Sequence, residues 1–219
     1  PLTILNKLQQ ESGPLAFVGL PDHVAAIRML QLKKHPTVKN IKYLFGPYTG
    51  TILKFQALQS YLKANGAKLE DVTQLSYRSG EWPGYLQINL KDGRALKAEK
   101  FYYNYLIPFF ITKRSSQLAV DFTNELTDIS VGDAWAPEYE KQGGGYSVIL
   151  TRTIAGQEIL NSMQSQNSIK LTPISNKKVI EMHAHMIDFK KRGTFIRMQI
   201  RALRGKGNPD FGYEPVHIP

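Results

Sequence analysis

Short apolar runs alternate with segments of helical periodicity over the first 66 residues of the chain. Residues 15–20 and 41–45 have the length and apolar character of buried strands. Between them, Val24, Ile27 and Leu30 recur at the spacing of one helical face, after a proline that favours the first helical turn. Helices are predicted at residues 2–12, from residue 21 onward and from about residue 51 to 65.

The third of these helices should turn Phe55, Leu58 and Leu62 toward the core and end at Asn65-Gly66, a pair typical of helix C-termini. Alternating strands and helices favour a parallel or mixed sheet. We therefore predict an α/β fold, with helices packed on a mixed sheet and a single domain over residues 1–219.

The middle of the chain changes character. Residues 85–90 and 95–101 alternate apolar and polar positions around an Asp-Gly turn, which predicts a hairpin. A strongly aromatic helix is predicted at residues 102–110. Residues 111–145 then read as one long loop, and loops of that length inside a domain are usually functional. We therefore expect the functional site in this loop.

The last third of the chain returns to alternating strands and helices, followed by a tail rich in glycine and proline. The elements predicted here are a strand at 146–153, a helix at 155–165, a strand at 168–173 and one or two helices at 176–204. The tail, residues 205–219, is predicted to be extended and could be an arm that docks on a partner.

Composition narrows the class of protein. No apolar run reaches the roughly 18 residues of a membrane span, since even residues 105–112 are interrupted by Pro108. The chain contains no cysteine, which fits a cytoplasmic protein and excludes thiolate metal sites and disulfides. Its start at Pro1, without a secretory signal, indicates processing or a piece of a longer protein. The net charge of +10 favours an anionic cofactor or substrate, an acidic subunit or simple solubility.

Three segments carry residues suited to binding. In residues 77–84, the Trp82 ring could stack on a planar ligand and Arg78 could hold a phosphate or carboxylate; a hairpin turn with a surface tryptophan is the alternative. Residues 121–135 hold aspartates and an asparagine among small residues, which could shape a pocket through turns and caps. The acidic residues also suggest a cation site, but the spacing of an EF-hand is absent.

In residues 143–147, three glycines precede a strand. Their backbone N–H groups could cradle an anion, or the segment could simply be a flexible loop.

Other groups point less clearly to a function. Asp22 lies in the turn that joins the first strand to the second helix, and we expect its carboxylate to cap that helix. A negatively charged cap would disfavour the binding of an anion at the helix N-terminus. His183 and His185 diverge on a helix, so a metal site is not predicted. Arg197, Arg201 and Arg204 share one helical face, which could be solvated, meet an acidic partner or meet phosphates. No nucleic-acid motif supports the basic charge, so nucleic acid is not the predicted partner.

The three segments occur together, in an order that resembles the beta-subunit family of deazaflavin (coenzyme F420) hydrogenases and dehydrogenases. Residues 18–28 are similar to the strand–turn–helix near that family's N-terminus, and the aspartate-rich run is the specific part of the resemblance. The resemblance implies an FAD-binding α/β fold, in which FAD exchanges hydride with a deazaflavin or reduces another substrate. It also implies a further N-terminal portion before Pro1. The predicted cofactor-binding residues are Arg78, Trp82, Asp121, Thr123, Asn124, Asp128, Asp133, Trp135, Gly144, Gly145, Tyr146, Ser147 and Arg152.

The resemblance also predicts that this chain has lost the cysteine ligands of an iron–sulfur cluster. Members of the family hold an iron–sulfur cluster with cysteines, and the corresponding positions here are Ser116, Ala119 and Asp22, which cannot supply thiolates. We therefore expect a flavin-dependent oxidoreductase without a cluster of its own, acting on an unknown substrate with a partner redox subunit. The alternatives are a non-catalytic, cluster-free scaffold of a redox complex and a basic nucleic-acid-binding module.

Overall fold

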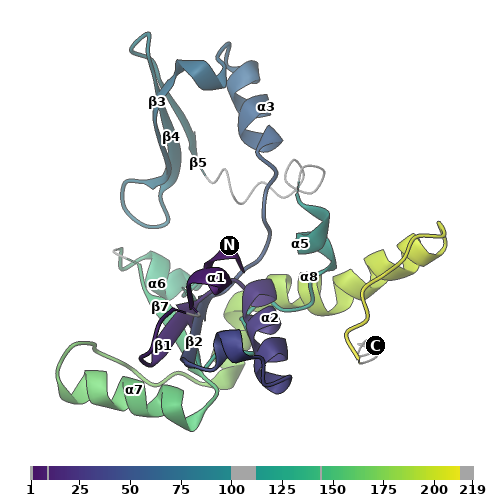
Figure 1. The fold of residues 1–219 in the computed structure, drawn as a ribbon. Coiled ribbons are helices and arrows are strands. Elements are labelled where there is room, and N and C mark those ends of the chain that lie inside the picture. Colours follow the sequence, from purple (N-terminus) through teal and green to yellow (C-terminus); the bar gives the residue numbers. More distant parts are fainter. Residues whose placement is uncertain (1, 9, 100–111, 144, 213–219) are drawn as a thin grey trace. The chain divides into compact units, whose positions relative to one another are not determined.

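The computed structural model describes residues 2–8, 10–99, 112–143 and 145–212 (Figure 1). The helix expected at 102–110, Gly144 and the end of the tail at 213–219 lie outside these residues. The chain divides into two compact units. Unit 1 comprises Pro1–Gly50, Leu118–Asp133 and Ser147–Pro219, and unit 2 comprises Thr51–Gln117 and Ala134–Tyr146. The single domain over residues 1–219 stays a prediction.

Unit 1 is built on a four-stranded mixed sheet in the order β1-β2-β6-β7. The strands are β1 (Leu15–Val18), β2 (Ile41–Pro47), β6 (Ile129–Asp133) and β7 (Ser147–Thr151). The first three run parallel, and β7 pairs with β6 antiparallel, with Ser130 opposite Leu150. This mixed sheet with helices confirms the predicted fold class.

Helices of unit 1 follow the strands as the apolar pattern predicts. They are η1 (Leu2–Ile4), α1 (Leu5–Leu8), α2 (Pro21–Leu32), η2 (Pro36–Val38), α7 (Ile154–Ser165) and α8 (Asn176–Ala202). Val24 and Ile27 of α2 are fully buried and pack with Ile41 and Leu44 of β2. Within the described ranges, no helix is both long and apolar enough to cross a membrane.

Unit 2 has its own three-stranded antiparallel sheet in the order β3-β4-β5. Its elements are α3 (Gln56–Ala64), η3 (Leu69–Asp71), β3 (Val72–Ser79), β4 (Tyr85–Leu90), β5 (Ala95–Glu99), α6 (Pro137–Glu140) and nearly all of α5 (Arg114–Leu118). The predicted hairpin is present as β4 and β5, and the structure adds β3. Leu58 and Leu62 of α3 pack with Leu86 and Ile88 of β4, so unit 2 has a separate core.

Two predicted elements, the loop at 111–145 and the strand at 168–173, were wrong. In both segments the local pattern of apolar and polar residues differs from the pairing in the folded chain. The expected loop at 111–145 contains β6, a central strand of five residues, Ile-Ser-Val-Gly-Asp, in which the polar Ser130 is fully buried and the apolar Val131 is exposed. Residues 168–173 alternate like a strand but do not pair with one. The sequence analysis did not predict β3. Its pairing with β4 shifts register twice, so buried and exposed side chains do not alternate regularly along β3.

Two side-chain predictions were also wrong. Phe55 precedes α3 and is 61% exposed, because the helix begins only at Gln56. Asp22 does not cap α2, where His23 Nδ1 accepts from the Leu20 N–H instead at 3.4 Å. In the described part of the tail, Arg201 donates to the Gly207 carbonyl and Asn208 to that of Met198, so these residues lie against α8. The extended tail that docks on a partner stays a prediction.

Candidate functional site

Unit 2 gathers an aromatic cluster from segments far apart in sequence. The rings of Trp82 and Trp135 lie 4.8 Å apart between centroids, tilted by 33°. The Arg78 guanidinium carbon lies 5.9 Å from the centroid of the Trp135 ring, and Arg78 Nε donates to the Pro83 carbonyl at 3.1 Å. Two indoles and a guanidinium therefore form a surface of flat, polarisable groups with a positive charge at its edge.

Gly145 is required by this cluster. Its φ is +71°, and a Cβ atom added there would lie 2.8 Å from Trp82 Cγ. The indole Nε1 of Trp82 is buried without a hydrogen-bond partner among the described residues. A buried N–H without an acceptor is costly, so this donor is the clearest sign in unit 2 of a group still to be bound.

Asp128 is the centre of a polar network in unit 1. Its carboxylate is buried and accepts from the Leu44 N–H at 2.7 Å, from Arg28 at 3.2 Å and from the Thr153 hydroxyl at 2.9 Å. These donors belong to β2, α2 and the start of α7. Asp128 therefore joins three elements and has the contacts of a structural carboxylate.

Asn124 lies where β1 and β2 end. It is fully buried, has a φ of +59°, and its Nδ2 donates to the Gly19 carbonyl at 2.8 Å and to the Pro47 carbonyl at 3.4 Å. Its Oδ1 has no partner among the described residues. Gly46 must stay small, because an added Cβ would lie 1.9 Å from Asn124 Nδ2. Carboxyl ends of parallel strands are where α/β folds usually bind ligands.

Arg152 lies beside this edge of the sheet. Its guanidinium donates to the Ser130 hydroxyl at 2.7 Å and to the Thr123 hydroxyl at 2.9 Å, with a longer bond to the Thr123 carbonyl. The Tyr48 hydroxyl is buried without a partner among the described residues. Burial raises the pKa of Tyr48 to about 12, while the charge of Arg152 opposes that rise. The positive charge of Arg152 thus favours the ionised form of the Tyr48 phenol, which is neutral at ordinary pH.

The ring of Tyr48 also belongs to an aromatic group in unit 1. It meets the rings of Phe122 and His183 edge-on at 5.4 and 5.3 Å between centroids. His183 is buried on α8, with its ring nitrogens 3.0 Å from the Val179 carbonyl oxygen and 2.9 Å from that of Asp133. No group of three or more His, Asp or Glu side chains within the described ranges could hold a metal ion.

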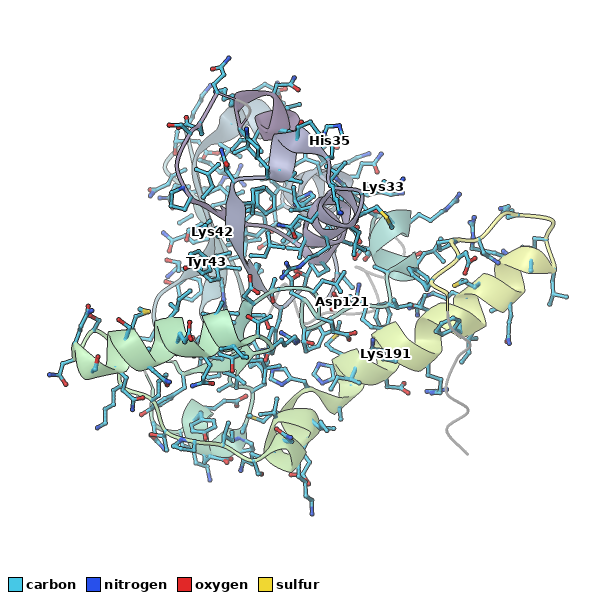
Figure 2. All side chains as sticks on the ribbon, turned by 60° about the horizontal axis from the view of Figure 1, so that its bottom comes forward. Lys33, His35, Lys42, Tyr43, Asp121 and Lys191 are labelled. Atoms are coloured by element: carbon cyan, nitrogen blue, oxygen red, sulfur yellow. The ribbon has the colours of Figure 1, made fainter. Side chains whose placement is uncertain are left out.

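A buried charge cluster adjoins Asp121. Lys190 of α8 is 1% exposed, and burial lowers its pKa to about 8, although the nearby charges of Asp22 and Asp121 raise it. Burial raises the pKa of Asp121, whose Oδ1 has no hydrogen-bond partner among the described residues. Figure 2 shows Asp121 next to the helix that carries Lys191, and Lys191 itself pairs with Glu125 at 2.6 Å.

The thirteen predicted residues fall into groups. Unit 2 brings together Arg78, Trp82, Trp135 and Gly145, whereas the Tyr146 hydroxyl donates to Gln142 instead. Unit 1 holds Asp121, Thr123, Asn124, Asp128, Asp133, Ser147 and Arg152. Gly144 lies outside the described residues. Sequence reasoning missed Tyr48 and Lys190. Only the position of Tyr48 directly after a strand-ending Gly-Pro pair could have indicated it.

Ser116, Ala119 and Asp22, the positions that the resemblance pairs with cluster cysteines, have other contacts. The buried Ser116 hydroxyl accepts from the Ile52 N–H at 2.9 Å. The Ala119 carbonyl accepts from the Thr194 hydroxyl at 3.1 Å, and Asp22 interacts with the charge of Lys190. The chain has no cysteine, so these residues do not fit an iron–sulfur cluster.

Fold and site together define a mixed α/β protein with a polar network at the carboxyl ends of its parallel strands. The chain belongs to the family defined by the C-terminal region of the coenzyme F420 hydrogenase/dehydrogenase beta subunit, whose model matches residues 13–177. This confirms the family that the three sequence segments predict.

Known proteins that are similar to the chain include a sulfite reductase and a subunit of a hydrogenase complex. The coenzyme F420-dependent sulfite reductase of Methanocaldococcus jannaschii is 22% identical over 192 residues, covering 81% of this chain but 28% of that protein. The chain thus spans less than a third of this relative. A structure of the F420-reducing [NiFe] hydrogenase complex from Methanosarcina barkeri includes a chain with the same fold. The TM-score is 0.67 at 16% identity, over 95% of this chain and 70% of that one.

Proposed function

We propose that this chain is a flavin-binding oxidoreductase domain, with FAD as cofactor and a deazaflavin as a candidate hydride donor or acceptor. The activities for which its relatives are named, F420-dependent sulfite reduction and F420 reduction, support redox chemistry with a deazaflavin. A bound flavin would supply the hydride chemistry, and the chain's residues would bind and orient it.

The observation that carries the proposal is the unpartnered indole N–H of Trp82. It lies in a cluster that offers what a flavin needs: aromatic faces for its ring, a buried donor for a ring acceptor and a guanidinium for negative charge. The lack of a side chain at Gly145 lets the backbone pack directly against Trp82, which holds the indole in place. We therefore assign ring binding to Trp82 and Trp135, with Arg78 at the edge.

Arg152, which belongs to unit 1, is proposed separately as an anion-binding group. Its bonds to Ser130 and Thr123 fix the guanidinium plane, and its Nε–H has no acceptor among the described residues. Tyr48, whose pKa responds to the charge of Arg152, lies nearby. A fixed fork of N–H donors is suited to phosphate. The absence of cysteine supports the cluster-free part of the proposal, in which electrons reach or leave the site without a cluster held by this chain.

The first test is the absorbance spectrum of the chain after incubation with FAD and gel filtration. A retained flavin spectrum supports the proposal, and a colourless protein contradicts it for this chain alone. Titration by flavin fluorescence then tests the residues. Trp82→Ala should weaken FAD binding about tenfold or more, whereas Tyr77→Ala, a similarly aromatic but exposed position on β3, should leave it unchanged.

Arg152 is tested separately, with inorganic pyrophosphate as the probe. If Arg152 binds phosphate groups, Arg152→Lys should weaken the binding of pyrophosphate about tenfold. A folded Arg152→Lys variant that binds pyrophosphate as tightly as the parent would show that Arg152 does not contact phosphate. A chain that binds FAD but exchanges no hydride with deazaflavin would favour the scaffold alternative.

A further inference from the structure

Three large aliphatic side chains are exposed in a row along the C-terminal half of α8 and its C-cap residue, Leu203. Ile196, Ile200 and Leu203 are 41%, 45% and 88% exposed. Their spacing of four and three residues places them on one side of the helix, within two turns. The other side of α8 is covered, since Lys190, Thr194 and neighbouring residues pack into unit 1. We call the exposed row the α8 stripe.

Basic residues predominate around the α8 stripe. Residues 189–206 contain seven lysines and arginines and no aspartate or glutamate. Arg192 and Arg204 flank the stripe on its two sides. Arg192 is paired with Asp188 at 2.6 Å, while no ion pair of Arg204 or Lys206 is found among the described residues. Several of the other basic residues are used internally, as Arg197 donates to the Phe189 carbonyl and Arg201 to the tail.

The α8 stripe also lies beyond the part of the chain that the family model describes. That match ends at residue 177, and α8 begins at Asn176. The surface is therefore not accounted for by the pattern that the family shares, and it is independent of the flavin site proposed above.

We propose that the α8 stripe is the docking surface for an acidic amphipathic helix of a partner protein. A narrow row of aliphatic residues matches the seam of a helix pair, where apolar side chains interlock and flanking charges select the partner. Acidic residues on the partner would complement the basic residues at this end of the helix, Arg204 and Lys206 above all. A second copy of α8 would instead bring two basic surfaces together. A membrane-binding helix usually has a wider apolar face with aromatic residues, which the stripe lacks.

The test is a binding titration of the full chain with a labelled synthetic peptide. The peptide should be a helix of about 20 residues, with leucines at a and d positions and glutamates beside them. A scrambled peptide of the same composition is the control. We expect the helical peptide to bind, and Ile200→Ser together with Leu203→Ser to weaken it about tenfold or more. Ile180→Ser is the matched control, because Ile180 is 57% exposed on α8 but lies outside the stripe, and it should have no effect.

The other outcomes decide against the proposal. No binding of the helical peptide, or equal binding of the scrambled one, overturns it. Stripe-dependent binding to vesicles containing phosphatidylglycerol, with no peptide binding, would identify a membrane surface instead. Sedimentation that shows a dimer lost in the double-serine variant would identify a second copy as the occupant. Unfolding curves of the variants check that these exposed substitutions leave the fold intact.

Discussion

Lys190 is an unusual residue because its charge is almost fully withdrawn from water. Burial lowers its pKa from 10.5 to about 8, with Asp22 and Asp121 opposing that shift and Arg197 adding to it. Below pH 8 the folded protein carries the full cost of the buried charge. Between pH 8 and 10.5 the folded protein has lost this proton while the unfolded chain keeps it, so the free energy of unfolding rises with pH.

We therefore expect urea unfolding to show a gain of about 2 kcal/mol between pH 7.5 and 9.5. Tyr48 does not interfere in this window. Its pKa is raised to about 12, so it removes stability only above pH 10. Lys190→Met should flatten the rise, and Lys191→Met, at a half-exposed neighbouring lysine, should keep it. A parent protein whose stability is level across this range would contradict the buried-charge assignment.

Gly132 has no side chain, and the Tyr48 ring occupies the space beside it. A Cβ atom there would lie 2.1 Å from Cδ2 of the Tyr48 ring, which is itself packed against Phe122 and His183. We expect Gly132→Ala to destabilise the protein by about 1–3 kcal/mol in urea unfolding, because the ring cannot move away without disturbing its neighbours. Gly13→Ala is the control, since nothing lies within 4 Å of its added Cβ. Equal midpoints for both variants would show that the ring moves freely.

At the scale of elements, Asp128 joins β2, α2 and the start of α7 through one buried carboxylate. Asp128→Asn would turn an amide N–H₂ toward at least one of three donors. We expect a loss of about 2–4 kcal/mol in unfolding free energy. Asp188→Asn removes an exposed carboxylate with two short contacts to Arg192 and should cost at most about 1 kcal/mol. Comparable losses in the two variants would refute the structural role of Asp128.

The elements also show which parts of the fold a sequence reveals. The helix α2 and the β4–β5 hairpin were predictable because Val24, Ile27 and the alternation from Leu86 to Leu90 report burial directly. The strand β6 was not, because its fully buried Ser130 is held by Arg152, 22 residues further along the chain. The three candidate segments stand out by their unusual composition, and their role in binding stays a prediction, whereas Lys190 was hidden in a helix that reads as a solvated basic face.

At the scale of the whole molecule, each unit has its own core and its own spectroscopic signal. Both tryptophans of the chain, Trp82 and Trp135, belong to unit 2, whereas α2, α7 and α8 belong to unit 1. Tryptophan fluorescence therefore reports unit 2, and helical circular dichroism reports mainly unit 1. The core of unit 2 depends on the fully buried Leu86, and that of unit 1 on the fully buried Ile27.

Separate cores predict separate responses to core truncation. Leu86→Ala should lower the stability of unit 2 by about 2–5 kcal/mol and shift the fluorescence midpoint more than the dichroism midpoint. Ile27→Ala should do the reverse, because its cavity opens under α2. If both signals shift together in both variants, the chain unfolds as one cooperative unit, and the boundaries drawn at Gly50 and Asp133 do not separate independent folding units.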